Sequence, residues 1–239
     1  MASLRLDKLI THMGLGSRKE AAQWARQGRL TVNGRPCRAE ERVDPQRDTI
    51  ALFGQPVRYQ EHVYVLLYKP AGCLTATRDA RQKTVLDLLP ARYRRMGLFP
   101  AGRLDKDTTG LLILTNDGDY CHRLVSPRFH VPKVYEAAVD GDIQPGQQEQ
   151  FARGLVLGDG TRCLPARLEP LGPGRVRVVV QEGKYHQVKR MLAQCGMPVK
   201  ALHRAAIGSL QLDAGMQPGQ WRELTGEEVA GLLSGKNSP

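Results

Sequence analysis

Two carboxylates, Asp105 and Asp107, stand directly ahead of an apolar run, and a third, Asp117, follows it in the segment GRLDKDTTGLLILTNDG. An Asp before a strand often only caps a turn or pairs with a neighbour, here Arg103. Arg103 is also close enough to keep Asp105 ionised. An ionised, poorly solvated carboxylate on a rigid loop is suited to covalent catalysis at carbon. Asp105 is therefore the candidate catalytic group.

The flanking residues favour Asp105 over the other two acids. Thr108 and Thr109 supply hydroxyls, and Gly110 keeps the backbone close. We expect Asp107 to be solvated and Asp117 to lie in the middle of a turn.

A second polar cluster follows in EGKYHQVKRM, residues 182–191. The spacing of Val188, Met191 and Leu192 predicts a helix that ends near Gly196. His186, Lys189 and Arg190 are spaced i, i+3 and i+4, which predicts a shared polar face. We interpret His186 as a structural hydrogen-bonding residue and not as a general acid. The histidines show no metal-ligand spacing.

The elements around these residues alternate without a regular βαβ order. Patterns predict strands over residues 63–68, 110–115 and 175–180, and helices over 84–89 and 119–125, with a final helix capped by Thr225 and Glu228. Lys69-Pro70-Ala71-Gly72 is a tight turn that brings a lysine to the end of a strand. This mixture predicts an α+β domain and not a doubly wound one.

A smaller module precedes this domain. Ser17 and Glu20 form an S-x-x-E capping box for a helix that should end near Gly28, and Asn33-Gly34 predicts a tight hairpin turn. An earlier amphipathic stretch places Leu6 and Leu9 on one face. Its polar faces carry Arg5, Lys8, Arg18, Lys19, Arg26 and Arg29. Turn signals place the domain boundary near residue 60, giving domains over residues 1–60 and 61–239.

The composition points to a polyanionic partner. Lys and Arg total 35 against 24 Asp and Glu, so the formal net charge is +11. Cationic side chains gain affinity for nucleic acid by displacing the counterions of phosphates. The five scattered cysteines indicate neither a disulfide framework nor a zinc site. We find no signal peptide and no apolar run that could span a membrane, and we expect a cytoplasmic monomer.

The first 50 to 60 residues resemble the S4 RNA-binding domain of ribosomal proteins and tRNA synthetases. The pattern R-L-D-K-L…S-R-x-x-A…G-x-V-x-V-N-G is nearly complete, with Leu30-Thr31-Val32-Asn33-Gly34 as its tail. The resemblance implies that the basic residues of this module form an RNA-docking surface.

The segment G-R-L-D-x-x-T-x-G-L-L-x-L-T-N-D-G resembles the catalytic motif of rRNA pseudouridine synthases of the RsuA type. Further blocks of that family recur in order: Lys69-Pro70-x-Gly72, Ser126-Pro127, Lys133-Val134-Tyr135, residues 182–191, His203-Arg204 and Ile207-Gly208. With the S4-like front, the resemblance covers nearly the whole chain. It implies a mixed, mainly antiparallel sheet and the isomerisation of a uridine to pseudouridine in ribosomal RNA, without metal or organic cofactor.

The resemblance also implies roles for individual residues. Asp105 is the essential carboxylate, acting at the sugar as nucleophile or as proton acceptor. Tyr135 stacks on the target base, and Lys189 pairs with Asp105, with Arg190 as runner-up. Arg103 holds RNA or the flipped nucleotide. Lys69 and residues 123–133 hold phosphates around the target loop.

Small-subunit RNA, free or as an assembly intermediate, is the expected substrate. Two alternatives stay open: a synthase acting on large-subunit RNA, and a non-catalytic RNA-binding assembly factor.

Overall fold

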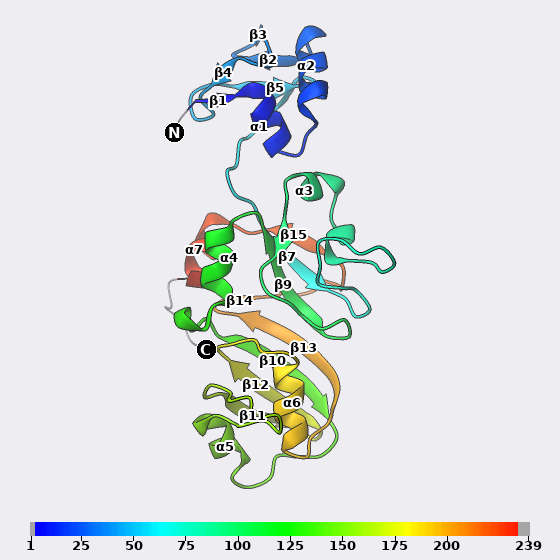
Figure 1. The fold of residues 1–239 in the computed structure, drawn as a ribbon, viewed down its shortest axis with the longest axis vertical. Coiled ribbons are helices and arrows are strands. Elements are labelled where there is room, and N and C mark those ends of the chain that lie inside the picture. The colour runs from blue at the N-terminus through cyan, green and yellow to red at the C-terminus, as the bar shows by residue number, and fades with distance from the viewer. Residues whose placement is uncertain (1–2, 234–239) are drawn as a thin grey trace. The chain divides into compact units, whose positions relative to one another are not determined.

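The computed structural model describes residues 3–233, so residues 1–2 and 234–239, at the outer ends of the two predicted domains, lie outside it. The described residues form two compact units (Figure 1). The first holds the chain up to Val63 together with Leu89–Leu98, and the second holds Tyr64–Leu88 and the chain from Phe99 onward. The boundary near residue 60 stays a prediction. No helix within residues 3–233 has the length and apolarity to cross a membrane.

The first unit combines short helices with two small sheets. Its helices are α1 (Leu6–His12), α2 (Arg18–Arg26) and α3 (Ala91–Arg95). Strands β1 (Leu4–Arg5) and β4 (Arg42–Val43) pair with each other, and a second sheet has the order β3 (Arg35–Pro36), β2 (Leu30–Val32), β5 (Ile50–Leu52), β6 (Gln55–Pro56). Leu6, Leu9 and Ile10 are fully buried in its core, as the amphipathic pattern predicted.

The predicted local signals of this unit are confirmed. Ser17 and Glu20 exchange the reciprocal hydrogen bonds of a capping box at the start of α2. Gly28 follows the helix with φ +66°, and Asn33 and Gly34 turn the chain between β2 and β3 with φ of +51° and +76°. Two successive positive φ angles are what a type I′ hairpin turn requires.

The second unit is built on one large sheet. Along it lie β11 (Arg167–Gly172), β12 (Arg175–Val180), β10 (Lys133–Val139), β13 (Val199–Ile207), β9 (Thr109–Thr115), β7 (Tyr64–Lys69) and β15 (Trp221–Glu223), with β14 (Leu210–Gln211) on β13 and β8 (Phe99–Pro100) on β9. All pairs are antiparallel except β13 with β9. The mixed, mainly antiparallel α+β class is therefore confirmed.

The parallel pair divides this sheet into two half-sheets. The first half-sheet comprises β11, β12, β10 and β13, and the second comprises β9, β7, β15 and β8. They are joined by the pairing of β13 with β9, whose register places His203 opposite Thr109 and Arg204 opposite Gly110. Gly110 has φ +113°, and a Cβ there would lie 2.3 Å from the Arg204 carbonyl oxygen. Only glycine allows so close an approach of β9 to β13.

Helices cover the half-sheets and complete their cores. The remaining elements are η1 (Val85–Leu88), α4 (Gly118–Val125), η2 (Pro127–Phe129), α5 (Gln147–Arg153), α6 (Gln187–Gln194) and α7 (Gly226–Leu233). Val188, Met191 and Leu192 of α6 pack with Val176 and Val178 of β12. Leu124 of α4 and Leu232 of α7 pack with Leu111 and Ile113 of β9. Apolar groups on both faces explain the continuous apolar run of β9.

Two local predictions are refined by the structure. The expected helix over 84–89 is a single 3₁₀ turn, η1, whose start is held by hydrogen bonds from Thr84 to the Asp87 carboxylate. Asp117 is not in the middle of a turn: it caps α4 by accepting from the Tyr120 N–H, and it also accepts from the Tyr64 hydroxyl at 2.7 Å.

Candidate active site

Asp105 lies on a loop whose neighbouring backbone is fixed from both sides. The Thr75 hydroxyl donates to the Leu104 carbonyl at 2.7 Å and accepts from the Leu104 N–H at 3.2 Å. The Lys106 carbonyl accepts from the Gly72 N–H at 2.8 Å. The Thr108 N–H closes a turn on the Asp105 carbonyl at 3.1 Å. A side chain held by such a loop loses little freedom when it meets a substrate.

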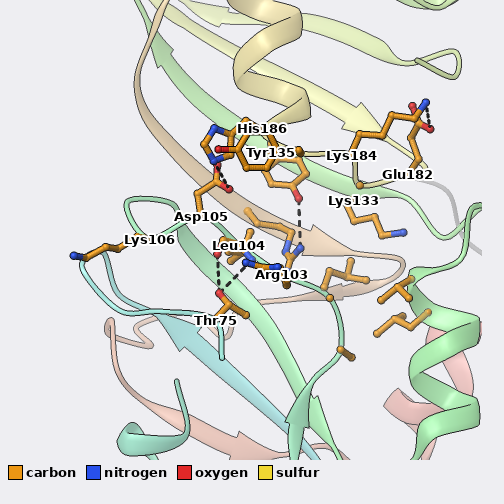
Figure 2. A pocket seen from close by; sticks show the side chains of 18 of the residues that line it. Thr75, Arg103, Leu104, Asp105, Lys106, Lys133, Tyr135, Glu182, Lys184 and His186 are labelled. Atoms are coloured by element: carbon orange, nitrogen blue, oxygen red, sulfur yellow. Dashed lines mark hydrogen bonds and ion pairs between the residues drawn. The ribbon is translucent and has the colours of Figure 1, made fainter. Parts of the chain in front are cut away.

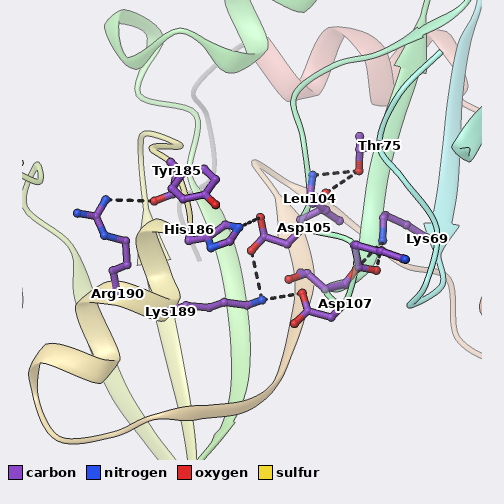
Figure 3. Close-up of polar contacts among 11 residues, drawn as sticks. Lys69, Thr75, Leu104, Asp105, Asp107, Tyr185, His186, Lys189 and Arg190 are labelled. Carbon is purple, nitrogen blue, oxygen red and sulfur yellow. Dashed lines mark hydrogen bonds and ion pairs between the residues drawn. The ribbon is translucent and has the colours of Figure 1, made fainter. Parts of the chain in front are cut away.

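Lys69 belongs to this support and not to the RNA surface for which it was predicted. Its side chain is fully buried, and its ammonium donates to the carbonyls of Pro70, Lys106 and Thr108 at 3.0, 3.2 and 2.9 Å (Figure 3). Burial lowers the pKa of Lys69. A phosphate in solvent has no access to a buried ammonium, so the expectation of a phosphate contact is corrected.

The carboxylate of Asp105 faces two side chains from the start of α6. Its Oδ1 lies 3.3 Å from Nε2 of His186, and its Oδ2 lies 3.3 Å from Nζ of Lys189 (Figure 3). The Asp105 side chain is 26% exposed and that of Lys189 is 22% exposed, so solvent screens this pair only in part. The two contacts fix the direction of both carboxylate oxygens.

Lys189 is held in its charged form by two acids. Burial alone would lower its pKa, but the hydrogen bond to Asp107 at 2.6 Å and the charges of Asp105 and Asp107 outweigh burial and raise the pKa of Lys189. The same hydrogen bond lowers the pKa of Asp107. The Asp107 side chain is 75% exposed, as predicted, but it shares the cation of Asp105.

His186 has a backbone conformation that non-glycine residues rarely adopt. It precedes α6 with φ +47° and ψ +33°, in the left-handed region. The exposed ring of Tyr185 stacks on the imidazole, with 3.9 Å between ring centroids. Such strain persists only where surrounding contacts fix it, and it is common at functional sites. His186 thus lies beside the carboxylate, as a positioning group.

Tyr135 and Arg204 come from adjacent strands, β10 and β13, and are cross-strand neighbours. Arg204 donates through Nε to the Leu111 carbonyl at 2.7 Å and through Nη1 to the Tyr135 hydroxyl at 3.4 Å. Its guanidinium carbon lies 6.0 Å from the centre of the Tyr135 ring. Arg204 thereby ties the ring to β9, the strand that follows the Asp105 loop.

A pocket of about 650 Å³, here called the active-site pocket, joins these groups (Figure 2). Asp105, Tyr135 and His186 line it, together with Arg204 and Lys133. Lys189 lines a smaller adjoining pocket that again includes Asp105 and Tyr135. The volume lies within the range of small-molecule sites, which is the size that one flipped nucleotide needs.

The remaining predicted residues of this unit are placed as follows. Arg103 is exposed at the rim of the active-site pocket, where it is available to RNA; Lys189 and His186, and not Arg103, meet the Asp105 carboxylate. Arg190 turns away from Asp105: it pairs with Asp159 at 2.6 Å and donates to the Tyr185 carbonyl at 3.3 Å. The predicted shared face therefore holds for His186 and Lys189 but not for Arg190.

In the first unit, all six predicted basic residues are exposed: Arg5, Lys8, Arg18, Lys19, Arg26 and Arg29. Arg5 is different from the others because it makes two hydrogen bonds to the nearly buried carboxylate of Asp7, at 3.1 and 2.8 Å. Its charge is largely compensated, so it is the weakest candidate of this set for a phosphate.

Sequence reasoning missed two residues of the site. Thr75 holds Leu104, but nothing in its local sequence distinguishes it from other loop threonines. Arg204 was noted only as part of a pattern; its burial, with 4% exposure, is unusual for arginine and depends on the approach of β13 to β9.

Comparisons with known proteins identify the families that the two units match. The family model described as RNA pseudouridylate synthase matches residues 63–194, and the S4 domain model matches residues 4–48. A crystal structure described as that of a pseudouridylate synthase has a TM-score of 0.67 and 35% identity, covering 97% of this chain and all of the other.

Two curated proteins are similar over almost their whole length. One, from Bacillus subtilis strain 168, is named an uncharacterized RNA pseudouridine synthase, YtzG; it is 42% identical, with 95% of this chain and 97% of that protein covered. The other, from Escherichia coli K12, is named ribosomal small subunit pseudouridine synthase A; it is 41% identical, with 96% of this chain and all of that protein covered.

Proposed function

The chain belongs to the RNA pseudouridine synthase family, and on this premise we propose that it converts a specific uridine of small-subunit ribosomal RNA into pseudouridine. The observation that carries the proposal is the position of Asp105, in a nucleotide-sized pocket beside Tyr135 and in contact with Lys189. The small-subunit substrate is supported by the name of the Escherichia coli relative.

In the proposed reaction, the target uridine leaves its stack and enters the active-site pocket. Extrusion of a base costs a few kcal/mol, and stacking on an aromatic ring returns roughly 1–3 kcal/mol. Tyr135 supplies that ring in this proposal. Its hydroxyl is held by Arg204, so the ring is oriented before the base arrives.

Asp105 then acts at the ribose. In one form of the mechanism its carboxylate attacks C1′; in the other it removes a proton from the sugar. Either way the C1′–N1 bond breaks and the free uracil rotates. A C1′–C5 bond then forms as Asp105 leaves C1′ in the first form, or returns its proton to the sugar in the second. C5 finally loses its hydrogen as a proton and N1 gains one, which restores the aromatic ring and the free carboxylate. Lys189 and His186, which contact the two carboxylate oxygens, keep the carboxylate directed at the ribose.

The exposed basic residues of both units are proposed to hold the surrounding RNA. Arg103 lies at the rim of the active-site pocket, and Lys8, Arg18, Lys19, Arg26 and Arg29 are exposed on the first unit, which matches the S4 domain family. Such phosphate contacts position the substrate, whereas the flipped base and loop shape give specificity. We propose that the protein acts as a monomer in the cytoplasm, where ribosomal RNA is its partner and where its five free cysteines stay reduced.

The test uses transcripts of small- and large-subunit RNA tritiated at uridine C5, because that tritium is lost when C5 forms its new bond. We expect release from small-subunit RNA, and none with Asp105→Asn, which keeps the shape of the side chain but removes its charge. Mapping of carbodiimide-modified pseudouridines in rRNA from a deletion strain should show one missing site in the small subunit. A missing large-subunit site would overturn the choice of substrate, and no release from either RNA would overturn the enzyme.

A further inference from the structure

Two buried cations of the active-site pocket have unused hydrogen-bond donors. Lys133 is 7% exposed and Arg204 is 4% exposed. Within residues 3–233, Nζ of Lys133 and Nη2 of Arg204 have no hydrogen-bond partner. Buried polar groups in native proteins are nearly always paired, and an unpaired buried charge opposes folding. Both residues also line the active-site pocket, in which the substrate must bind.

Both cations lie next to the ring on which the base is proposed to stack. Lys133 and Tyr135 are two residues apart on β10, opposite Val180 and Val178 of β12, so they share one face of the sheet. Arg204 bonds to the Tyr135 hydroxyl. Figure 2 draws Asp105 and Lys133 on opposite sides of the Tyr135 ring. A base on that ring would thus have the carboxylate at one edge and the ammonium at the other.

The cationic side chains of the active-site pocket fall into an exposed set and a buried set. Arg103, Lys106 and Lys184 are exposed at its rim, where RNA phosphates can reach them without leaving water. Lys133 and Arg204 are buried, so their ligand has to enter the pocket. Of the parts of a flipped nucleotide, the uracil enters deepest, and its carbonyls at C2 and C4 are hydrogen-bond acceptors.

The proposed reaction moves one negative charge from Asp105 to the uracil. If Asp105 attacks C1′, its charge is consumed in the new C–O bond, and the C1′–N1 electron pair leaves on N1. If Asp105 takes a sugar proton, the C–H pair forms a double bond to C1′, and the C1′–N1 pair again leaves on N1. In both cases a neutral carboxyl or ester replaces the carboxylate, and a uracil anion forms whose charge is shared with its carbonyl oxygens.

We propose that Lys133 and Arg204 bind the carbonyl oxygens of the detached uracil and stabilise its negative charge. This inference rests on the proposed function. Donors preorganised where charge develops, in a site with little water, lower the barrier more than they would in solution. Cytosine carries an amino donor in place of one carbonyl, so the same pair disfavours it. Two like charges also repel each other when the pocket is empty, and an anion relieves that repulsion.

Lys133 is the better residue to test, because Arg204 also supports Leu111 and Tyr135. We compare wild-type protein with Lys133→Met, which keeps length and removes charge, and with Lys133→Arg, which keeps charge. The single-turnover rate of tritium release at saturating protein, and separately the Kd for RNA, are measured on C5-tritiated small-subunit transcripts. We expect Lys133→Met to lose about 100- to 1,000-fold in rate, with Kd changed less than about threefold. Lys133→Arg should recover at least about tenfold of that loss, since the donor charge is restored.

Lys200→Met is the matched control. It removes an exposed lysine that pairs with Asp140 and does not line the active-site pocket, so the RNA Kd and the saturated rate should both stay near those of wild type. Should Lys133→Met weaken RNA binding and leave the saturated rate near that of wild type, its partner is a phosphate and the assignment to uracil is wrong. A wild-type rate in Lys133→Met would overturn this inference alone, whereas no release by wild-type protein would overturn the proposed function and this inference with it.

Stability gives a readout that does not depend on activity. An unpaired buried ammonium opposes folding, so thermal unfolding of Lys133→Met should occur at the wild-type temperature or above it. A purely structural lysine would give the reverse, a lower unfolding temperature, and that result would count against a role in the reaction.

Discussion

Nζ of Lys189 lies 3.3 Å from Oδ2 of Asp105, and this ion pair joins α6 to the loop before β9. Lys189 packs with the first half-sheet through α6, whereas Asp105 leads into the second half-sheet. The pair therefore orients the carboxylate and also links the two parts of the pocket. Asp107 competes for the same ammonium at 2.6 Å, so the cation is held between two acids.

Replacing Lys189 tests this arrangement. Lys189→Met removes the cation from Asp105, and we expect the single-turnover rate to fall by about 100-fold or more, because the carboxylate loses its orientation and its charge partner. Lys189→Arg keeps the charge with a different geometry and should lose less. Asp107→Asn is the control: it frees Lys189 for Asp105 and should leave the rate within a few-fold of wild type. A rate in Lys189→Met equal to that in Asp107→Asn would show that the pair is dispensable.

Lys69 should be required for stability and not for RNA affinity. Lys69→Met removes three hydrogen bonds from a buried ammonium, and we expect a loss of about 3 kcal/mol in the free energy of unfolding. For a unit of this size that corresponds to roughly 6–12 °C in the unfolding temperature. Calorimetry measures the shift, and filter binding of RNA below that temperature should give the wild-type Kd. A weaker Kd with unchanged stability would restore the phosphate contact that the burial of Lys69 argues against.

Gly110 should tolerate no side chain. In Gly110→Ala the new Cβ meets the Arg204 carbonyl and the residue keeps an unfavourable φ, so we expect a loss of about 3 kcal/mol or more in unfolding free energy. Gly118→Ala is the matched control, because a Cβ at Gly118 meets no atom within 4 Å. At the start of α4, alanine should be neutral or slightly stabilising. Equal unfolding temperatures for the two variants would contradict the close approach of β9 to β13.

The charge of Lys133 predicts a pH dependence of activity. Burial, followed by the nearby positive charge of Arg204, lowers the pKa of Lys133 to about 8. If the protonated form holds the uracil anion, kcat/KM should fall as the pH rises through about 8, and the fall should be absent in Lys133→Arg. The pocket also contains these titratable or charged side chains: Arg103, Asp105, Lys106, Tyr135, Glu182, Lys184, Tyr185, His186 and Arg204.

Whereas kcat/KM should fall as the pH rises through about 8, the free energy of unfolding should rise. The pKa of Lys133 is lower in the folded state than in the unfolded chain, so the unfolded chain binds more protons above pH 8. The contribution of this group to stability therefore rises with pH between about 8 and its ordinary value of 10.5. Chemical unfolding of wild type and Lys133→Met at pH 7.5 and pH 9.5 measures this difference. If the stability of Lys133→Met rises between pH 7.5 and pH 9.5 as much as that of wild type, the rise comes from another titratable group.

The exposed basic residues of the first unit should bind RNA through its phosphates. Substituting Lys19 by Gln should weaken RNA binding and reduce the slope of log K against log salt by about one. The saturated rate of isomerisation should be unchanged, because the substitution does not alter the active-site pocket. Arg47→Gln is the control. The guanidinium of Arg47 already has the carboxylate of Asp44 as its ion-pair partner, so this substitution should leave the salt slope near that of wild type. Identical salt slopes for wild type and Lys19→Gln would show that this helix does not contact RNA.

Local sequence signals predicted the elements well because their causes are local. The capping box of Ser17 and Glu20 satisfies helix N–H groups within four residues, and Asn33-Gly34 adopts the angles its turn needs whatever surrounds it. The apolar run of β9 likewise predicted a strand with two covered faces. The catalytic segment could be singled out because Asp105 stands ahead of that run and the residues around it resemble a family motif.

The contacts that define the site join residues that are far apart in the sequence, so they were harder to predict. Helical spacing grouped His186, Lys189 and Arg190, but His186 precedes the helix in a left-handed conformation and Arg190 turns to Asp159. Lys69 was expected to hold a phosphate, but its ammonium is buried and donates to the carbonyl of its neighbour Pro70 and to those of Lys106 and Thr108, on a loop distant in sequence. The segment Leu89–Leu98 packs with the first unit although it interrupts the second in sequence, and its local pattern gave no sign of this.

The hydrogen atom that serves as the side chain of Gly110 has an effect beyond its own strand. It lets β9 and β13 pair closely, so that the two half-sheets meet with the acid on the loop before β9 and the aromatic ring on β10. The spacing between reactants is thus set by backbone contact and not by long, flexible side chains. A substitution at Gly110 would therefore slow catalysis even if every participating group were still present and correctly protonated.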